Sequence, residues 1–177
     1  MSSWLDVALL AVLIVLNGVF AMSEISLVTS RRARLQRLID DKVAGAERAR
    51  ELNADPNRAL STIQVGITSI GILSGIVGES ALARPMEAFL VMVGLSPETA
   101  KAIGLFVVVV LITYFSIVMG ELVPKRIGQI SPERIACRLA PPIHCLSIIA
   151  APFVKLLSVS THLPVSYTHL RAHETTL

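Results

Sequence analysis

Two glutamates beside small or polar residues are the groups in this sequence best suited to binding chemistry. Glu24 follows Ser23 near the end of one apolar run, and Glu121 follows Gly120 at the end of another. Burying an ionised side chain in hydrocarbon costs about 2.5–3.5 kcal/mol even on insertion scales, so such residues mark ion pathways or ligand sites. Hard cations such as Mg²⁺ take carboxylate, hydroxyl and carbonyl oxygens as ligands. The two segments therefore predict a cation site, provided that the fold brings them together.

A third apolar run carries neutral oxygen atoms at a similar predicted depth. Gln64 and Thr68 fall in the half of this run that we expect to face the cytoplasm, level with both glutamates. The backbone carbonyl of Gly120 is a further possible ligand. Pro124, one turn later, has no N–H, so this carbonyl lacks its helical hydrogen-bond donor. All three runs therefore bring oxygen atoms to a similar level, and the residues that carry them are Ser23, Glu24, Ser26, Thr62, Gln64, Thr68, Ser69, Ser116, Gly120 and Glu121.

A structural interpretation explains the same residues without a ligand. Serine and threonine in membrane helices commonly hydrogen-bond to their own backbone or to a neighbouring helix. Glu24 and Glu121 can lie at the membrane interface, paired with Arg31 or Lys125. The spacing alone leaves the cation site and structural ion pairing open. We interpret Lys125 and its neighbour Arg126 as orientation anchors at the headgroups rather than as ligands.

The composition indicates which elements must position these residues. Of the 177 residues, 53% are hydrophobic and only 16% are charged, and the mean hydropathy is +0.68. Such a chain is typical of a membrane protein. Three runs, at about residues 4–26, 59–79 and 103–123, approach the roughly 20 apolar residues that cross a bilayer. We expect an all-α integral membrane protein with three transmembrane helices plus juxtamembrane or interfacial helices.

The sequence also predicts the structure of three segments outside the spans. Residues 31–53 place apolar side chains at helical spacing among Arg and Glu, which predicts an interfacial helix. Residues 139–159 are apolar but contain three prolines and Lys155, which indicates a broken or interfacial helix rather than a span. Residues 165–177 become abruptly polar and aperiodic, and we expect a non-native or disordered tail there after a membrane domain over 1–160.

The distribution of basic residues predicts the topology. Residues 31–58 are rich in arginine and should be cytoplasmic, whereas the loop at 79–101 should lie outside. The N-terminus is then outside and the C-terminus in the cytoplasm, as expected for a multi-pass protein of the cell membrane. The net charge of +3 comes from these flanks, so it favours anionic lipid headgroups over nucleic acid as a partner.

Three stretches carry a resemblance to a known family. They are "NGVFAMSEISLVTSRRARLQRL" at 17–38, "LSTIQVGITSIGILSG" at 60–75 and "GELVPKRIGQISPERIA" at 120–136. In this order they resemble the membrane domain of the CorC/CNNM family, also called hemolysin-C-like or magnesium and cobalt efflux proteins. The resemblance covers roughly residues 5–160. The second stretch departs from the family pattern, because Gly66 is followed by Ile67 and Thr68 where many relatives have Gly-Asn.

The resemblance implies a homodimer of three-span membrane domains that holds a cation between the spans. It implies transport of Mg²⁺, as export coupled to Na⁺, and no organic cofactor. Ser23, Glu24, Gly120 and Glu121 match the family's motifs by position, and we take Gln64 and Thr68 as substitutes for the second-span ligand. The resemblance thus gives Ser23, Glu24, Gln64, Thr68, Gly120 and Glu121 as the predicted metal ligands. In most members cytosolic CBS domains that bind ATP follow the membrane domain. The 177 residues contain no CBS domains, so we expect ATP binding only in a full-length protein.

We therefore read the chain as the membrane domain of a divalent-cation transporter, with Mg²⁺ as the exported ion. The alternative is a non-transporting membrane sensor or regulatory module that acts through partner proteins. We do not expect an enzyme, because the sequence has no nucleophile–base pair, phosphate-binding loop or metalloprotease spacing.

Overall fold

The computed structural model describes residues 3–152, so the expected tail at 165–177 and the end of the segment at 139–159 lie outside the described residues. Within this range every regular element is a helix. The elements in chain order are α1 (Ser3–Thr29), α2 (Arg32–Asp40), α3 (Ala46–Ala54), α4 (Pro56–Gly78), the π-helix η1 (Glu79–Ala83), α5 (Arg84–Met92), α6 (Pro97–Ile117), the π-helix η2 (Val118–Leu122) and α7 (Val123–Ile130). One more helix, Pro132–Pro152, follows α7.

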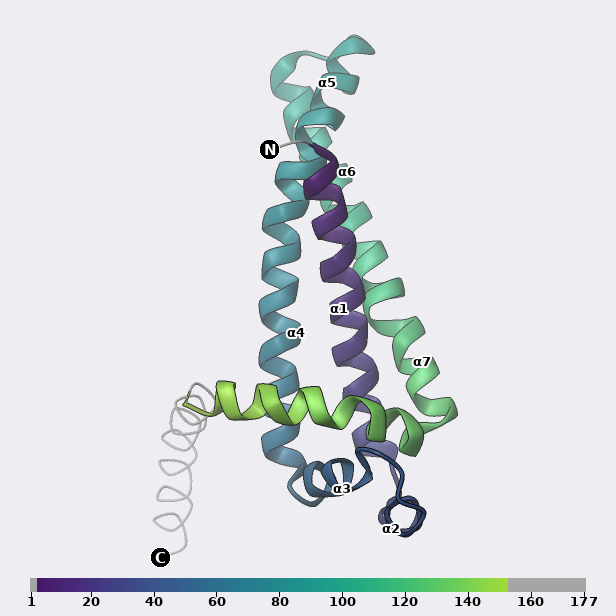
Figure 1. Ribbon diagram of the computed structural model, residues 1–177. Coiled ribbons are helices and arrows are strands. Elements are labelled where there is room, and N and C mark those ends of the chain that lie inside the picture. Colours follow the sequence, from purple (N-terminus) through teal and green to yellow (C-terminus); the bar gives the residue numbers. More distant parts are fainter. Residues whose placement is uncertain (1–2, 153–177) are drawn as a thin grey trace, which may run out of the picture.

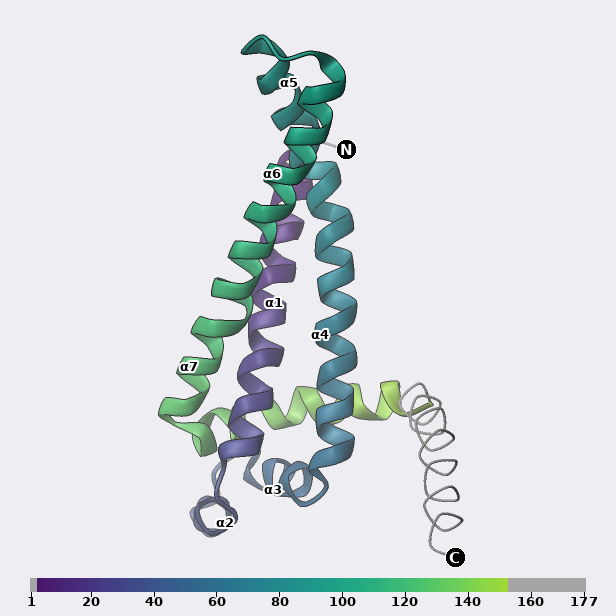
Figure 2. The ribbon, with the colours of Figure 1, turned by 180° about the vertical axis from the view of Figure 1, so that it is seen from behind.

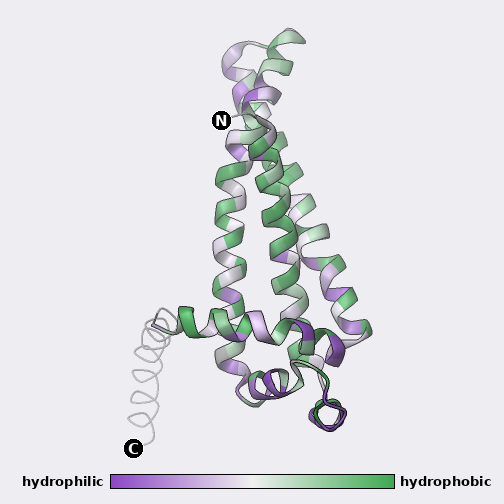
Figure 3. Cartoon of the chain, in the orientation of Figure 1, coloured by the Kyte–Doolittle hydropathy of each residue, from purple (hydrophilic) through white to green (hydrophobic). Residues whose placement is uncertain are grey.

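Three long helices stand side by side, as both views of the ribbon show (Figures 1 and 2). The first is α1, the second contains α4, and the third runs without a break from α6 through η2 into α7. Their apolar side chains are largely exposed, and Figure 3 shows this hydrophobic colouring along all three. A soluble protein rarely exposes so much apolar surface to water. In a membrane protein, such a surface faces lipid.

Four helices, rather than the three predicted, are long and apolar enough to cross a membrane. The fourth is Pro132–Pro152, drawn in yellow-green, and it lies across one end of the three upright helices (Figure 1). This helix is not broken as the prolines suggest, since it continues through Pro141 and Pro142. The length and composition of these helices thus support a multi-pass membrane protein. The fourth helix differs from the other three because it runs across them rather than alongside them.

The segment predicted as a loop at 79–101 is mostly helical. The helix of α4 continues through the π-turn η1 into α5, which folds back against α6. The connection between α5 and α6 includes Gly94 at a φ of +106°, a conformation that favours glycine. α6 then begins at Ser96, whose side-chain oxygen accepts a hydrogen bond from the backbone N–H of Thr99. The result is a helical hairpin at the end opposite to α2 and α3 (Figure 1).

Residues 31–53 form two short helices, α2 and α3, instead of the single helix predicted. The turn between them places Lys42 at a φ of +54° and Gly45 at +80°. A Cβ atom added to Gly45 would lie 2.0 Å from the carbonyl oxygen of Cys137 in the last helix. Pro141 removes the helical donor that this carbonyl would otherwise have. The split therefore arises from close contact between two distant segments.

The buried core is concentrated where α2, α3 and the last helix meet the ends of α1 and α4. Its most enclosed members include Leu35, Ala46, Ala49, Ile63, Ala136 and Cys137. Polar bonds reinforce this belt: Asn53 Nδ2 donates to the carbonyl of Leu27 at 2.9 Å, and the backbone N–H of Arg31 donates to Glu133 Oε1 at 3.3 Å. The lower end of α1, which carries Glu24, is therefore held in place by several elements.

Candidate cation site between the first and third long helices

Glycines allow α1 to approach the η2–α7 part of the third helix closely. A Cβ atom on Gly18 would lie 2.8 Å from Pro124 Cγ, and one on Gly128 would lie 2.5 Å from Ile25 Cγ2. Real Cβ atoms essentially never come this close to a neighbour, so both positions need a residue without a side chain. On α1 these contacts lie on either side of Glu24, and on the third helix they begin three residues after Glu121, so they bring the two predicted segments together.

The two glutamates share one cation that belongs to the protein itself. Lys125 Nζ lies 2.9 Å from Glu121 Oε1 and 3.3 Å from Glu24 Oε2. The side chains of Glu24 and Lys125 are 27% and 32% exposed, and that of Glu121 is 49% exposed. The pair of carboxylates is therefore partly withdrawn from solvent and carries a net charge of −1 together with the lysine. This arrangement differs from the predicted one, in which Lys125 is a headgroup anchor.

The serines on α1 lie beside this cluster but bond to their own helix. The Ser23 hydroxyl is almost fully buried and donates to the carbonyl of Val19 at 2.7 Å. The Ser26 hydroxyl, also buried, donates to the carbonyl of Ser23 at 3.0 Å. This is the behaviour expected under the structural interpretation. A hydroxyl that donates one bond still has lone pairs, so the Ser23 oxygen retains its capacity as a ligand.

The carbonyl of Gly120 also has a partner that the sequence does not suggest. Asn17 Nδ2 donates to the Gly120 oxygen at 3.0 Å, in the π-turn η2 that also contains Glu121. The other amide atom, Asn17 Oδ1, is buried and has no hydrogen-bond partner among the described residues. An unpaired buried acceptor costs about 1–3 kcal/mol. A π-turn with an unsatisfied oxygen beside it is typical of a functional position.

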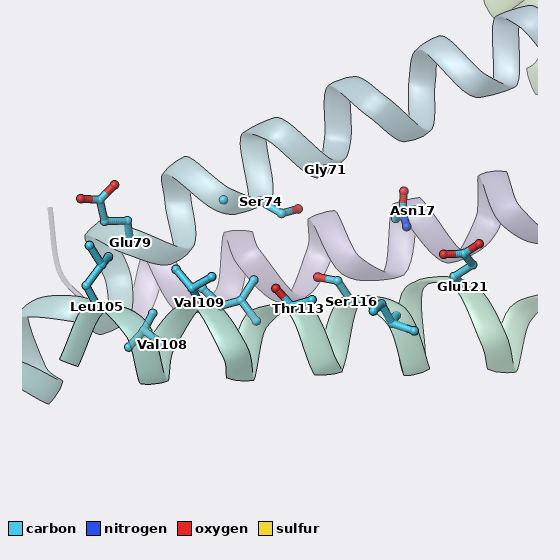
Figure 4. Close-up of a pocket in the computed structure, with 13 residues that line it drawn as sticks. Asn17, Gly71, Ser74, Glu79, Leu105, Val108, Val109, Thr113, Ser116 and Glu121 are labelled. Atoms are coloured by element: carbon cyan, nitrogen blue, oxygen red, sulfur yellow. The ribbon is translucent and has the colours of Figure 1, made fainter. Parts of the chain in front are cut away.

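A cavity of about 310 Å³ opens beside this turn, between α1, α4 and α6. Its polar lining comes from Asn17, Ser74, Glu79, Thr113, Ser116 and Glu121, and valine, leucine and isoleucine side chains of α6 form most of the apolar wall. Figure 4 shows Glu79 at one end of the cavity and Glu121 at the other, with the hydroxyls and Asn17 between them. Glu121 therefore belongs both to the lysine-bridged cluster and to the cavity.

The predicted ligands fall into two groups. Four of them, Ser23, Glu24, Gly120 and Glu121, lie where α1 meets η2. Gln64 and Thr68 are exposed on α4 and are absent from the lining of the cavity. Within residues 3–152, no group of three or more His, Cys, Asp or Glu side chains is placed to hold a metal ion. A metal held here would thus need neutral oxygens or water in addition to the two carboxylates.

Asn17 is a contributor to the site that sequence reasoning missed. In the sequence it is a polar interruption of the first apolar run, yet it lies seven residues before Glu24 and so on the same side of α1. The seven-residue spacing could therefore have identified Asn17 as a candidate site residue. The contact of Lys125 with Glu121 has i,i+4 spacing, and the structural interpretation had named Lys125 as a possible partner of the glutamates.

Comparison with known proteins agrees with this architecture. The family described as Cyclin M transmembrane N-terminal domain (CNNM) matches residues 8–176. The UPF0053 protein sll0260 of Synechocystis sp. is 44% identical over 157 residues, which cover 89% of this chain and 35% of that protein. The UPF0053 protein YhdT of Bacillus subtilis is 33% identical over 155 residues, covering 88% of this chain and 34% of that protein.

A third relative has a functional name. The polyamine export protein of Escherichia coli (strain K12) is 32% identical over 142 residues, which cover 80% of this chain and 32% of that protein. The chain thus spans about a third of the length of the curated relatives it matches. Because the family match extends over most of its residues, this chain belongs to the CNNM family, through that family's transmembrane domain.

Proposed function

We propose that this chain is the membrane domain of a cation transporter, and that its cargo is Mg²⁺, moved out of the cell. The observation that carries the proposal is the convergence of Glu24 and Glu121 on one positive charge, Lys125 Nζ. Carboxylates from two different long helices are brought together at this point, within a bundle of largely apolar helices. The CNNM family match and the relatives named as export proteins support a membrane transporter-like role.

The surroundings suit a small hard cation that keeps part of its water. Mg²⁺ typically uses one or two carboxylates and retains several waters in an octahedral shell. Glu24 and Glu121 supply the carboxylates, and the hydroxyl of Ser23 is a neutral oxygen close by in the chain. The adjoining cavity of about 310 Å³ corresponds to about ten water molecules at about 30 Å³ each, so it has room for a hydrated ion.

The cavity is also the basis for a proposed path of the cation. Glu121 lies at one end and Glu79 at the other, near the α5–α6 hairpin (Figure 4). We infer that a cation collected at the Glu24–Glu121 pair passes along Asn17, Ser116 and the apolar wall toward Glu79. With the arginine-rich end in the cytoplasm, this path leads outward. Na⁺ entering along the same path is our proposal for the coupling ion.

The remaining architecture follows from the same proposal. Pro132–Pro152 lies across the end of the bundle where α2 and α3 are found (Figure 1), and we propose that this end faces the cytoplasm and that only the three upright helices cross the bilayer. The chain pairs as a homodimer, and the exposed Gln64 and Thr68 on α4 then face the second copy or lipid. The protein catalyses no covalent reaction. This chain spans about a third of the length of those relatives, and we propose that any ATP binding requires a longer protein.

A second cargo, a linear organic polyammonium ion, is favoured by one specific observation. The group held between the two carboxylates is an ammonium on an aliphatic stem, which is the repeating chemical unit of a polyamine. The cavity next to it has a long apolar wall and a carboxylate at each end (Figure 4). One relative is named as a polyamine export protein.

A flux assay separates these cargoes. The purified protein is placed in liposomes, and the movement of Mg²⁺ and of spermidine is measured separately for the wild type and for Glu121→Gln. Mg²⁺ flux that is lost in the folded variant supports the proposal. Spermidine flux alone supports the second cargo. Absence of both fluxes contradicts transport and leaves the regulatory module as the explanation.

A further inference from the structure

Lys125 is paired with carboxylates within the protein. Its ammonium contacts two carboxylates on two different helices, at 2.9 Å and 3.3 Å. The next residue, Arg126, is exposed and makes no ion pair within residues 3–152. Two adjacent cations in one helix therefore have different environments. Only Lys125 is directed into the candidate site.

The fold holds the lysine there through contacts of the backbone. Lys125 follows Pro124, which is buried against Gly18 of α1, so the start of α7 is held close to α1. One helical turn separates Lys125 from Glu121, and the ammonium completes the link to Glu24 on α1. The lysine stem remains free to move, because its side chain is only half-buried and has four rotatable carbons.

We propose that Lys125 is an internal cation that occupies the carboxylate pair when no cargo is bound and that must leave when cargo binds. This inference rests on the proposed function, since it concerns the same site, and it adds a residue that sets the affinity and selectivity of that site. Without cargo, the ammonium keeps two half-buried carboxylates from repelling each other. With cargo, the lysine swings toward water while the backbone stays in place.

Charge explains why the lysine would select among cations. The two carboxylates and the ammonium sum to −1, so a divalent ion added beside the lysine would leave an excess of positive charge at the site. Divalent or polyvalent cargo must therefore replace the ammonium rather than join it. A monovalent ion brings no more charge than the ammonium that it would displace, whereas a divalent or polyvalent ion brings more. Cargo with at least two positive charges thus displaces Lys125 more readily than Na⁺ or K⁺ does.

The test compares three variants by calorimetric Mg²⁺ titration of detergent-purified protein. Lys125→Met removes the competing charge at similar length and should raise Mg²⁺ affinity about tenfold or more, which corresponds to one decade in Kd. Lys125→Arg keeps a permanent charge in a bidentate fork and should weaken binding severalfold. Arg126→Gln, the matched control, should stay within about twofold. Equal or weaker binding by a folded Lys125→Met protein would overturn the inference.

A second readout follows the lysine itself and does not require the methionine variant to fold. Wild-type protein is treated briefly with an amine-reactive acetylating reagent, with and without Mg²⁺, and acetylation of Lys125 is quantified by mass spectrometry. Displacement predicts a severalfold increase in acetylation when Mg²⁺ is present, with Lys42 and Lys101 unchanged. Mg²⁺ binding without any change at Lys125 contradicts displacement. No binding by the wild type contradicts the Mg²⁺ proposal itself, so the two failures are distinguishable.

Discussion

At the scale of single residues, the candidate cation site depends on two carboxylates that one lysine of the protein partly neutralises. Glu121 has two candidate roles, as a ligand or as a structural partner of Lys125, and one substitution separates them. Glu121→Gln should weaken Mg²⁺ binding at least about tenfold, because a hard cation loses a charged ligand. Glu24→Gln should have a similar effect, and Ser23→Ala a smaller one. The measurement is calorimetric titration after size exclusion has shown that each variant is folded.

The structural interpretation of Glu121 makes a different forecast. If its carboxylate serves only the ion pair with Lys125, the variant should lose folded protein, while binding per folded molecule stays at the wild-type value. Arg48→Gln is a suitable control, because Arg48 forms an exposed pair with Glu51 at 2.7 Å, far from the site in the sequence. Exposed pairs of this kind contribute about 0–1 kcal/mol, so that variant should behave as the wild type.

Asn17 supports a second prediction at this scale. Asn17→Leu removes the donor to the carbonyl of Gly120 and places an apolar group beside Glu121. The loss of one partner of a buried hydrogen bond costs about 1–3 kcal/mol, so the thermal midpoint in detergent should fall. Cation flux should fall further than stability explains, since a polar residue is lost from the cavity lining. Thr29→Val is the control, because Thr29 is exposed and bonds only to its own helix. Wild-type flux in folded Asn17→Leu would exclude Asn17 from the path.

At the scale of elements, the approach of α1 to α7 depends on glycines. A Cβ atom on Gly128 would lie 2.5 Å from Ile25 Cγ2 and 3.0 Å from the carbonyl of Met22. Gly128→Ala should therefore destabilise the protein by about 1–3 kcal/mol through overpacking. It should also separate Glu24 from Lys125 and lower the affinity for cations. Thermal unfolding in detergent and Mg²⁺ titration measure the two effects.

Gly71 in α4 provides the matched control for that prediction. A Cβ atom there would meet nothing within 4 Å, so Gly71→Ala creates no clash. Alanine is favoured over glycine in a helix by about 0.8–1.0 kcal/mol in water, so stability should be equal or higher. If Gly71→Ala and Gly128→Ala lower the thermal midpoint equally, close packing of α1 against α7 is not what the glycines provide.

At the scale of the whole molecule, the last described helix tests the topology. Cys145 is exposed near the middle of Pro132–Pro152, whereas Cys137 is buried. If this helix lies on the cytoplasmic face, a charged thiol reagent should label Cys145 in a Cys137→Ser background only when it has access to the inner side. If the helix crosses the bilayer, Cys145 lies in hydrocarbon and should not react.

The ends of the upright helices complete the test. In a background without the native cysteines, single cysteines at Arg48 in α3 and at Met92 in α5 should react from opposite sides of the membrane, because the two positions lie at opposite ends of the bundle (Figure 1). Met92 is 84% exposed, and Arg48 is also exposed, so access is not limited by packing. Labelling of both from the same side would contradict the proposed topology.

The sequence by itself determined the class of this protein and the two segments that meet at the site. The length of an apolar run and the cost of an ion in hydrocarbon are local properties, so the long helices, and Glu24 and Glu121 as candidate site residues, could be predicted without coordinates. The family resemblance rested on the same local motifs. Helix ends were less predictable, since π-turns continue two of the helices beyond the expected limits.

Only the tertiary structure decided which atoms face one another. Asn17 and Gly120 are bonded across a separation of 103 residues, and Lys125 reaches Glu24 on another helix. The turn at Gly45, which divides the predicted interfacial helix, is set by contact with Cys137. The exposure of Gln64 and Thr68 depends on the rotation of α4 against its neighbours. Such contacts arise from packing between distant segments, and no local pattern of residue types encodes them.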